Sequence, residues 1–376
     1  METMQTPRIS RLASWLLLLV LFTATHPSAA AAAAAPHMHS RALPSPQQRQ
    51  FGTENHWETL SSLPLGPRQE NSVAALGTDI YILAGITSAA PNATDFPSLQ
   101  LVQAYATERR TWRRVADVPT PLNHAHLAAV AGKLYMLGSL TGGGPFTPVG
   151  VGYEYDAGAD AWTRLPKGDL PEGLERGAGA VGVWRDRFVI VAGGLTYNNP
   201  FTGIQNTSAD VSVFDTQTGT WLPGEDWPAL PDGGRDHAGG AVVGDTMYVV
   251  GGRTNGRTNV KGDVFALDLS ALPEARKWEA RAGMPTPRGG LMAAAVDGKI
   301  YTFGGEGEEA QGAGPGGVFR EVELYDTEAD SWEKLPAMPF PRHGTGAAAV
   351  AGRIYIPGGA NMTGAGATSV VDSFSP

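Results

Sequence analysis

Six tryptophans recur at intervals of 50 to 59 residues, and this repeat constrains the fold more than any other feature of the chain. They are Trp57, Trp112, Trp162, Trp221, Trp278 and Trp332. A glycine pair recurs in the same rhythm, as Gly193-Gly194, Gly251-Gly252, Gly304-Gly305 and Gly358-Gly359, with degenerate copies at Ala84-Gly85 and Gly138-Ser139. Repeats of this length are typical of architectures in which small structural units pack side by side.

Each repeat predicts four short β-strands. In the repeat that begins at Arg288, the apolar segment Leu291–Val296 is joined to Lys299–Phe303 by Asp297-Gly298. An Asp-Gly pair between two apolar runs predicts a hairpin, because glycine adopts positive φ freely. Leu324–Asp326 and, after a short turn, Ser331-Trp332 mark a third and a fourth strand. A sheet this small cannot bury its faces alone, so we expect the sheets to pack on one another.

These landmarks resemble those of the kelch family of β-propellers. The resemblance covers residues 56–374 and implies an all-β fold with six blades. Trp57 lies in a fourth strand that has no first three strands ahead of it, and Ser369–Phe374 is a third strand with no fourth behind it. We therefore expect the N-terminal strand to complete the last blade, which would pair two edges otherwise open to aggregation.

The N-terminal region has the composition of an export signal. Arg8 and Arg11 precede the apolar run Trp15–Phe22, and small residues follow. We predict a signal peptide over residues 1–30, a disordered leader over residues 31–52 and the propeller over residues 53–376. The apolar run is too short for a mature membrane anchor, so we expect a protein that is secreted or retained within the secretory pathway. The sequons would then be glycosylation sites, at Asn92, Asn206 and Asn361.

The composition argues against several classes of function. A formal net charge of −9 and a pI near 5.4 argue against nucleic acid or an anionic membrane as the main partner. The chain has no cysteine, so it forms no disulfide. It also cannot form the tyrosine–cysteine cofactor of the copper oxidases that share kelch blades. We expect no cofactor and no bound metal, and the sequence leaves the oligomeric state open.

One face of the propeller is expected to carry the function. The approaches to the first strands and the loops between second and third strands share this face, and long loops on a rigid scaffold often carry binding sites. Two of the predicted long loops are Leu140–Gly150 and Leu195–Asp210. An arginine recurs just before the first strands, as Arg68, Arg176, Arg235, Arg288 and Arg342.

Two roles are open for these arginines. Their guanidiniums would encircle one mouth of the channel and bind a substrate carboxylate or a developing oxyanion, with Arg288 acting in catalysis. Alternatively, the arginine belongs to the repeat itself and bonds loop carbonyls or acids between blades.

Two histidines are candidates for proton transfer. The second repeat has Leu122 in place of the arginine, and His124 follows it by two residues, as His237 follows Arg235. Strand alternation predicts that His124 and His126 point to one side, as a metal-binding pair would. No carboxylate or cysteine at ligand spacing supports a metal, however, and a histidine bonded to a backbone carbonyl is the alternative.

Acidic and aromatic residues complete the candidate site. Glu70 and Glu175 lie near the arginine positions and are candidates to face the channel, whereas Glu321 and Glu323 are expected in solvent. Four aromatic residues are expected to line an apolar mouth with a few polar donors, which is the usual form of a small-molecule site. They are Phe146, Phe201, Trp227 and Phe340.

Three functions are compatible with these features. As an exported kelch protein of this size, the chain resembles the fungal kelch proteins of specialised-metabolite pathways, some of which are hetero-Diels–Alderases. That resemblance implies a cofactor-free cycloaddition promoted by positioning and hydrogen-bond donation to a small-molecule ligand. The first alternative is a non-catalytic propeller that binds carbohydrate or protein. The second is a mutarotase or epimerase of sugar acids, in which the arginines bind the carboxylate. Whether the protein is an enzyme stays open at this point.

Overall fold

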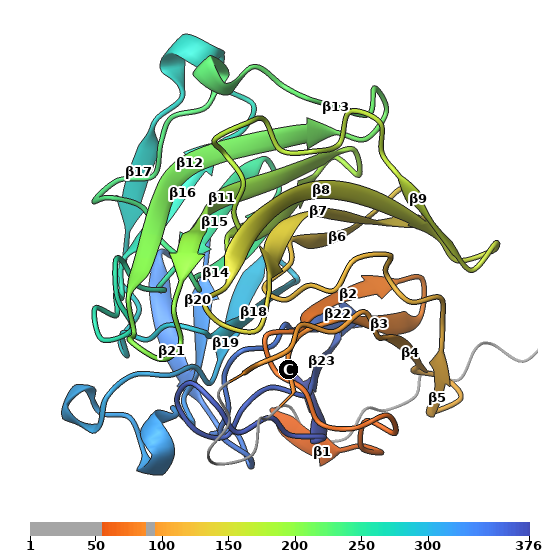
Figure 1. Cartoon of the computed structure of the whole chain (residues 1–376). Coiled ribbons are helices and arrows are strands. Elements are labelled where there is room, and N and C mark those ends of the chain that lie inside the picture. The colour runs from red at the N-terminus through yellow and green to blue at the C-terminus, as the bar shows by residue number, and fades with distance from the viewer. Residues whose placement is uncertain (1–54, 88–94) are drawn as a thin grey trace, which may run out of the picture. The chain divides into compact units, whose positions relative to one another are not determined.

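The computed structural model describes residues 55–87 and 95–376, which form six antiparallel sheets of four strands each (Figure 1). The described residues belong to one compact unit. The predicted signal peptide and leader lie outside the described residues. Among the helices within the described ranges, none has the length and apolar character needed to span a bilayer. The predicted six-bladed all-β propeller is confirmed.

Five blades follow the chain in order from the innermost strand outward. The first two contain β2 (Ser72–Leu76), β3 (Asp79–Leu83), β4 (Val102–Ala106), β5 (Thr111–Arg114), and then β6 (Leu127–Val130), β7 (Lys133–Thr141), β8 (Thr147–Asp156), β9 (Ala161–Arg164). The next three contain β10 (Ala180–Trp184), β11 (Phe188–Asn198), β12 (Gln205–Asp215), β13 (Thr220–Trp221); β14 (Gly239–Val243), β15 (Thr246–Val250), β16 (Val264–Asp268), β17 (Trp278–Arg281); and β18 (Met292–Val296), β19 (Lys299–Phe303), β20 (Val322–Asp326), β21 (Ser331–Leu335). Within the described part of the chain, four short 3-10 helices lie between strands, at η1 (Gly224–Asp226), η2 (Pro273–Ala275), η3 (Glu309–Gln311) and η4 (Pro315–Gly317).

The sixth blade joins the two ends of the propeller. It contains β22 (Ala348–Val350), β23 (Arg353–Pro357), β24 (Val371–Ser375) and, as its outermost strand, β1 (His56–Thr59). β1 and β24 pair antiparallel, with Trp57 opposite Phe374. The expected closure by the N-terminal strand is therefore present, and the ladder satisfies backbone groups that would otherwise form an open edge.

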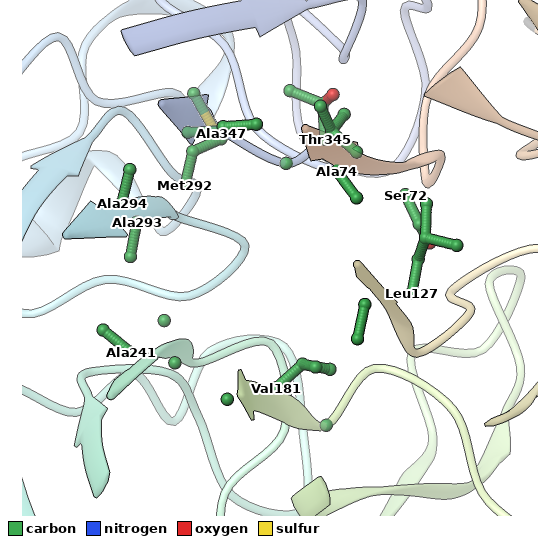
Figure 2. Close-up of a pocket in the computed structure, with 18 of the residues that line it drawn as sticks. Ser72, Ala74, Leu127, Val181, Ala241, Met292, Ala293, Ala294, Thr345 and Ala347 are labelled. Atoms are coloured by element: carbon green, nitrogen blue, oxygen red, sulfur yellow. The ribbon is translucent and has the colours of Figure 1, made fainter. Parts of the chain in front are cut away.

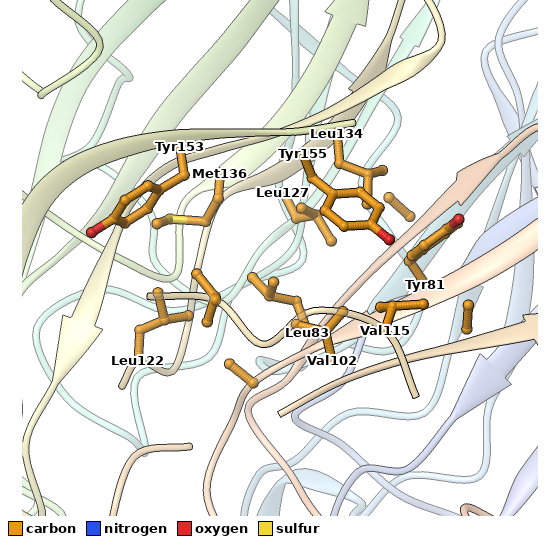
Figure 3. Packing of buried hydrophobic residues seen from close by; sticks show 14 residues of the cluster. Tyr81, Leu83, Val102, Val115, Leu122, Leu127, Leu134, Met136, Tyr153 and Tyr155 are labelled. Atoms are coloured by element: carbon orange, nitrogen blue, oxygen red, sulfur yellow. The ribbon is translucent and has the colours of Figure 1, made fainter. Parts of the chain in front are cut away.

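The hydrophobic core is divided among the six junctions between neighbouring blades. Figure 3 shows the junction of the first and second blades, where Tyr81, Leu83 and Val102 pack toward Leu134 and Met136. Equivalent clusters lie at the other five junctions. Full burial of a large apolar side chain contributes about 1.5–3 kcal/mol, so this packing can hold the ring without disulfides.

The repeated tryptophans tie each blade to its neighbour. Trp332 in the fifth blade donates its indole N–H to Ala282 O at 2.8 Å, at the end of the fourth blade. All six indoles make the same bond, including Trp57 to Pro336 O at 3.1 Å across the closure. The indole is thus an apolar plate with one donor, which explains why this residue type marks the repeat.

The glycine pairs lie where neighbouring blades approach most closely. Gly305 N donates to Arg342 O of the next blade at 3.0 Å. Gly304 has a φ of 51°, and a Cβ there would lie 2.2 Å from the same Arg342 oxygen. Only glycine allows this contact, so the landmark records backbone proximity.

Two of the predicted long loops are largely strand. In the second and third blades the pairs β7–β8 and β11–β12 continue beyond the glycine landmarks, with register shifts after Leu137 and Ala192. Leu140–Gly150 and Leu195–Asp210 are therefore mostly extended hairpins, and the prediction of loops there was wrong. A bulge at the glycine position lets each ladder resume, which the spacing of landmarks does not reveal.

Replacing Trp57 by alanine tests the closure. Its ring packs 5.0 Å from Phe374 and 5.7 Å from Phe303, centroid to centroid. Loss of this packing and of the indole hydrogen bond should lower the free energy of unfolding by about 3 kcal/mol, measured by urea denaturation. Phe340→Ala, at a side chain 48% exposed, should change it by less than about 0.5 kcal/mol. Equal effects of the two substitutions would contradict the role of Trp57.

Candidate functional site

The repeated arginines are buried inside their own blades. Their exposed fractions are at most 1% at Arg68, Arg176, Arg235, Arg288 and Arg342. Arg342, for example, donates to Ile356 O and to Asp372 Oδ2, each at 2.7 Å. None of the five lines the cavities described below. This placement matches the alternative in which the arginine belongs to the repeat, and ligand binding by the five stays a prediction that no cavity contact supports.

Arg288 illustrates what the arginines do. Its guanidinium pairs with the Glu323 carboxylate, and both side chains are at most 1% exposed. Its Nε donates to Gly304 O at 2.6 Å. Burial lowers the pKa of Arg288, and the charge of Glu323 opposes that shift. The expectation that Glu323 is solvated was wrong, because its position opposite Thr302 on β19 faces it toward the arginine.

A closed circle of six backbone hydrogen bonds lies two residues beyond the arginine positions. Each N–H donates to the carbonyl of the preceding blade, as His124 N does to Glu70 O at 2.9 Å. The circle runs through Glu70, His124, Ala178, His237, Gly290 and Gly344 and closes from Glu70 N to Gly344 O. All six have φ between 50° and 63°, the left-handed region. A residue with a side chain costs of order 1 kcal/mol or more in conformational free energy in this region. The hydrogen bonds of the circle therefore hold the backbone in a conformation that it would not adopt alone.

Three side chains of this circle meet near the propeller axis. The Nε2 atoms of His124 and His237 are 3.2 Å apart, and Glu70 Oε2 lies 3.1 Å from Nε2 of His124. The three are largely buried, with His124 7% and His237 8% exposed. Glu175 is not part of this group, because its carboxylate accepts from Gly173 N at 2.8 Å. We call Glu70, His124 and His237 the axial cluster.

His126 does not join His124, and the predicted pair was wrong. The φ of 50° at His124 reverses the backbone before the strand begins, so strand alternation does not apply between the two. His126 Nδ1 lies 2.9 Å from Leu137 O, and its Nε2 accepts from Gly179 N at 3.0 Å. Burial, with the charge of Arg176, lowers the pKa of His126 to about 3. It is a neutral histidine that joins two blades.

Charged groups from the last three blades surround one side of the axial cluster. Arg253 donates to Asp236 Oδ1 at 3.2 Å and also pairs with Glu306. Asp236 Oδ1 lies 2.7 Å from Nδ1 of His237. His343 Nε2 lies 3.5 Å from Glu306 Oε2, and its Nδ1 lies 3.9 Å from a Glu70 oxygen. The Arg253 guanidinium is thus shared by two carboxylates.

These neighbours shift the ionisation of the acids. Burial alone would raise the pKa of Glu70, but the charges of His124, His237 and His343 outweigh it and lower that pKa. Burial would also raise the pKa of Glu306, but the charges of His343 and Arg253 outweigh it and lower that pKa from 4.5 to about 2. Burial and Arg253 lower the pKa of His237. The acids are therefore anionic in neutral solution.

The first three blades surround the opposite side with apolar groups. Ile86, Leu140, Leu195 and Phe146 form a buried cluster, against which Phe96 packs. The ring of Phe146 lies 5.9 Å from that of His124. Ile86, Leu140 and Leu195 occupy the position that Arg253 and Glu306 occupy in later blades. The site is thus apolar on one side and charged on the other.

The axial cluster separates two cavities. The larger, of about 540 Å³, runs along the inner strands, and its wall is mostly alanine, glycine and valine. Figure 2 shows Ala74, Val181 and Ala241 around the open space. The smaller, of about 40 Å³, lies among the loops beside Phe146 and Arg253. Glu70, His124 and His237 line both, so the cluster forms the inner end of the channel.

The four predicted aromatic residues do not form one wall. Phe146 lines the smaller cavity. Phe201 is 49% exposed and lies 5.5 Å from Phe96, outside the residues that line the cavities. Trp227 is buried between the third and fourth blades under the guanidinium of Arg276. Phe340 is exposed. The predicted apolar mouth is therefore replaced by a channel lined with small side chains.

Two of the three sequon asparagines can be placed. Asn206 and Asn361 are exposed at the surface, which is the accessibility that a glycan requires. Asn92 lies outside the described residues.

Sequence reasoning missed Arg253, Asp236, Glu306 and His343 as parts of one group. Arg253 and Glu306 directly follow the second glycine of two landmark pairs, and Asp236 and His343 directly follow the repeated arginine. The residue after the second glycine and the residue after the arginine are charged in some repeats and uncharged in others. Comparing these two positions across the repeats could have found the group.

The comparisons with known proteins agree on the family. Residues 201–373 match the model of the KLHDC2/KLHL20/DRC7 Kelch-repeats domain. Kelch-like protein terF of Aspergillus terreus is 36% identical over 326 residues, which cover 85% of this chain and 68% of terF. The chain belongs to the kelch-repeat family. It spans less of Kelch-like protein 34 of Homo sapiens, which is 29% identical over 69% of this chain and 38% of its own length.

Two further matches cover only part of this chain or share only its fold. N-acetylneuraminate epimerase of Brucella suis is 33% identical over 163 residues, which are 42% of this chain and 39% of that protein. The solved structure of YjhT superposes with a TM-score of 0.65 and 17% identity, over 83% of this chain and 95% of YjhT. That likeness shows a shared propeller fold.

Substitution of a buried arginine tests its structural role. Arg288→Met leaves the Glu323 carboxylate buried without its partner and should lower the free energy of unfolding by about 3–5 kcal/mol. Arg288→Met/Glu323→Leu should recover most of that loss. Arg114→Met, at a side chain 61% exposed and paired with Asp117, should cost at most about 1 kcal/mol. A small loss in Arg288→Met, measured by urea denaturation, would instead show an arginine free to serve a ligand.

The lowered pKa of Glu306 predicts a pH-dependent stability. A carboxyl whose pKa falls from 4.5 to about 2 on folding stabilises the folded state above pH 4.5, and this contribution is lost as the pH falls toward 2. Glu306→Gln should therefore be less stable than the unmodified protein at pH 7, with a difference that narrows between pH 4.5 and 2. Denaturant curves across this range measure it. Glu309→Gln, at an exposed side chain, is the control. A constant difference for Glu306→Gln would refute the prediction.

Proposed function

We propose that the protein binds a small, uncharged and largely apolar organic molecule in the central channel, with an oxygen of that molecule against the axial cluster. One observation carries this proposal: a cavity of about 540 Å³ ends at three ionisable side chains from three blades. Its volume falls in the range of small-molecule sites, which combine apolar walls with a few convergent polar groups.

The reaction that suits this site is a non-redox cycloaddition, of the hetero-Diels–Alder type. A quinone methide supplies a conjugated carbonyl and methylene, an alkene supplies two carbons, and the new C–O and C–C bonds form with no atom lost. The apolar wall would keep out water, which otherwise adds to the methylene. Polarisation of the carbonyl oxygen by the axial cluster would lower the barrier, and confinement would supply the orientation.

A second candidate is an isomerase of sugar acids, favoured by the partial similarity to an N-acetylneuraminate epimerase. The channel gives it less support, because its lining residues include no arginine or lysine to bind a carboxylate. Of the two arginines that line the smaller cavity, Arg253 and Arg257, the first is already paired with two acids. A propeller that binds carbohydrate or protein without turnover is the third candidate.

Export is also part of the proposal. It is supported by the basic and apolar segment at residues 8–22 and by the exposure of Asn206 and Asn361. Glycans on these asparagines would lie on the surface, apart from the channel lining.

The cycloaddition is tested with an ortho-quinone methide released in buffer together with ethyl vinyl ether. The protein should raise the ratio of cycloadduct to water adduct by at least about tenfold, equivalent to about 1.4 kcal/mol in relative barriers, and should favour one enantiomer. Chiral chromatography of the products measures both. Ala129→Phe, which fills the channel from a half-buried wall position, should abolish the effect.

Ala157→Phe is the matched control, because this exposed residue lies in the turn between β8 and β9. A racemic adduct in the ratio seen in buffer would remove the cycloaddition proposal. If the protein instead accelerates the exchange of N-acetylneuraminate anomers, followed by NMR, the isomerase replaces it. Glycan or peptide retention without turnover would favour the binding module.

A further inference from the structure

The proton positions on the two histidines of the axial cluster follow from their Nδ1 partners. Asn123 Oδ1 contacts Nδ1 of His124, and the Asn123 amide nitrogen donates to Ser98 Oγ at 2.7 Å, which orients the amide. Asp236 Oδ1 lies 2.7 Å from Nδ1 of His237. Amide and carboxylate oxygens accept, so both Nδ1 atoms carry a proton. With Nδ1 protonated, Nε2 is the atom of each ring that can offer a lone pair to a cation.

These lone pairs converge with a carboxylate at one point. The two Nε2 atoms are 3.2 Å apart, and Glu70 Oε2 is 3.1 Å from that of His124. One ligand atom from each of the three residues lies within 4.8 Å of the other two. Acceptors this close repel one another in a buried site unless a positive charge lies among them.

A fourth acceptor points to the same place. Nε2 of His343 lies 2.9 Å from Met362 O and donates to it, so Nδ1 is the atom of this ring that can offer a lone pair. Nδ1 of His343 is buried, has no hydrogen-bond partner among the described residues, and lies 3.9 Å from Glu70 Oε1. A positive charge beside the Glu70 carboxylate would therefore also satisfy His343.

We propose that a divalent first-row transition-metal ion, such as Zn²⁺ or Mn²⁺, is bound by Glu70 and the Nε2 atoms of His124 and His237. Ligand atoms about 2.1 Å from an ion, at angles between tetrahedral and octahedral, lie about 3.0–3.4 Å apart. The separations of 3.1 and 3.2 Å fall within that range. Two imidazoles and one carboxylate are a ligand set for Zn²⁺ and Fe²⁺, whereas Ca²⁺ takes oxygen ligands.

The neighbours of the two histidines have the form that metal sites require. A metal-binding imidazole usually donates its other N–H to a carboxylate, carbonyl or amide, which fixes the ring and its tautomer. Asp236 does this for His237 and is itself held by Thr207 and Arg253. Asn123 does it for His124. Both rings are thus pre-oriented toward the ion position.

Three protein ligands leave at least one coordination position for an exogenous group. The axial cluster lines the channel, so an oxygen of a channel ligand could occupy that position and be polarised by the ion. The ion would supply the polarisation of the carbonyl oxygen on which the proposed function depends. The proposal of a metal site itself is argued from the ligand geometry alone.

Titration of the full chain with Co²⁺ tests the site. After treatment with EDTA and removal of the chelator, one equivalent of Co²⁺ should produce visible d–d absorption bands typical of low coordination number. One equivalent of Zn²⁺ should abolish these bands, and calorimetry should give a stoichiometry of one. Zn²⁺ should also raise the midpoint of thermal unfolding. This measurement uses the unmodified protein, so it does not depend on whether any variant folds.

Variants locate the ion. Glu70→Gln and His237→Asn should lose the bands, with folding checked by circular dichroism. Asp236→Asn should weaken Co²⁺ binding by about 10- to 100-fold, because it releases the His237 ring. His56→Asn, which removes an exposed histidine in β1, should bind as the unmodified protein does.

Two results would overturn the metal site. The first is an absence of both Co²⁺ bands and a Zn²⁺-dependent thermal shift in the unmodified protein, which would leave a proton shared between His124 and Glu70 as the positive charge. The second is binding unchanged by Glu70→Gln and His237→Asn. Neither readout contains an organic ligand, so this proposal and the cycloaddition can each fail without the other.

Discussion

The circle of six backbone hydrogen bonds at the inner ends of the blades is the constraint on which the site depends. It requires a left-handed residue at the same position of every repeat, although four of the six are not glycine. The conformational cost is of order 1 kcal/mol or more per residue, offset by a ring of bonds that no single blade could make. Because the ring surrounds the axis, side chains at this position from different blades can meet.

The blades share a backbone but divide the chemistry. Glu70, His124 and His237 occupy three positions of the circle, whereas Ala178 and two glycines occupy the others. A Cβ at Gly344 would lie 2.6 Å from a Glu70 carboxylate oxygen, so the small residue there makes room for the acid. The departures from the repeat, and not its landmarks, therefore define the site.

Much of the fold follows from the sequence because the landmarks report local physics. Gly304 marks a close backbone contact, and Trp57 marks a bond between blades. The site was harder to predict. Arg288 repeats as regularly as the landmarks because it too is structural, and its burial beside Glu323 depends on which way a third-strand side chain faces. The left-handed turn at His124 cancels the strand alternation on which the pairing with His126 relied, and Glu70 joins the histidines only through ring closure.

The antiparallel pairing of β1 with β24 has a mechanical consequence. His56 lies opposite Ser375 and Thr59 lies opposite Asp372. The N-terminal end of β1 and the C-terminal end of β24 are therefore at the same end of the ladder. Tension between the two chain ends would load these hydrogen bonds one after another, as in unzipping, and not all together, as in shear. The seam that completes the ring is thus the place where a pulling force opens it first.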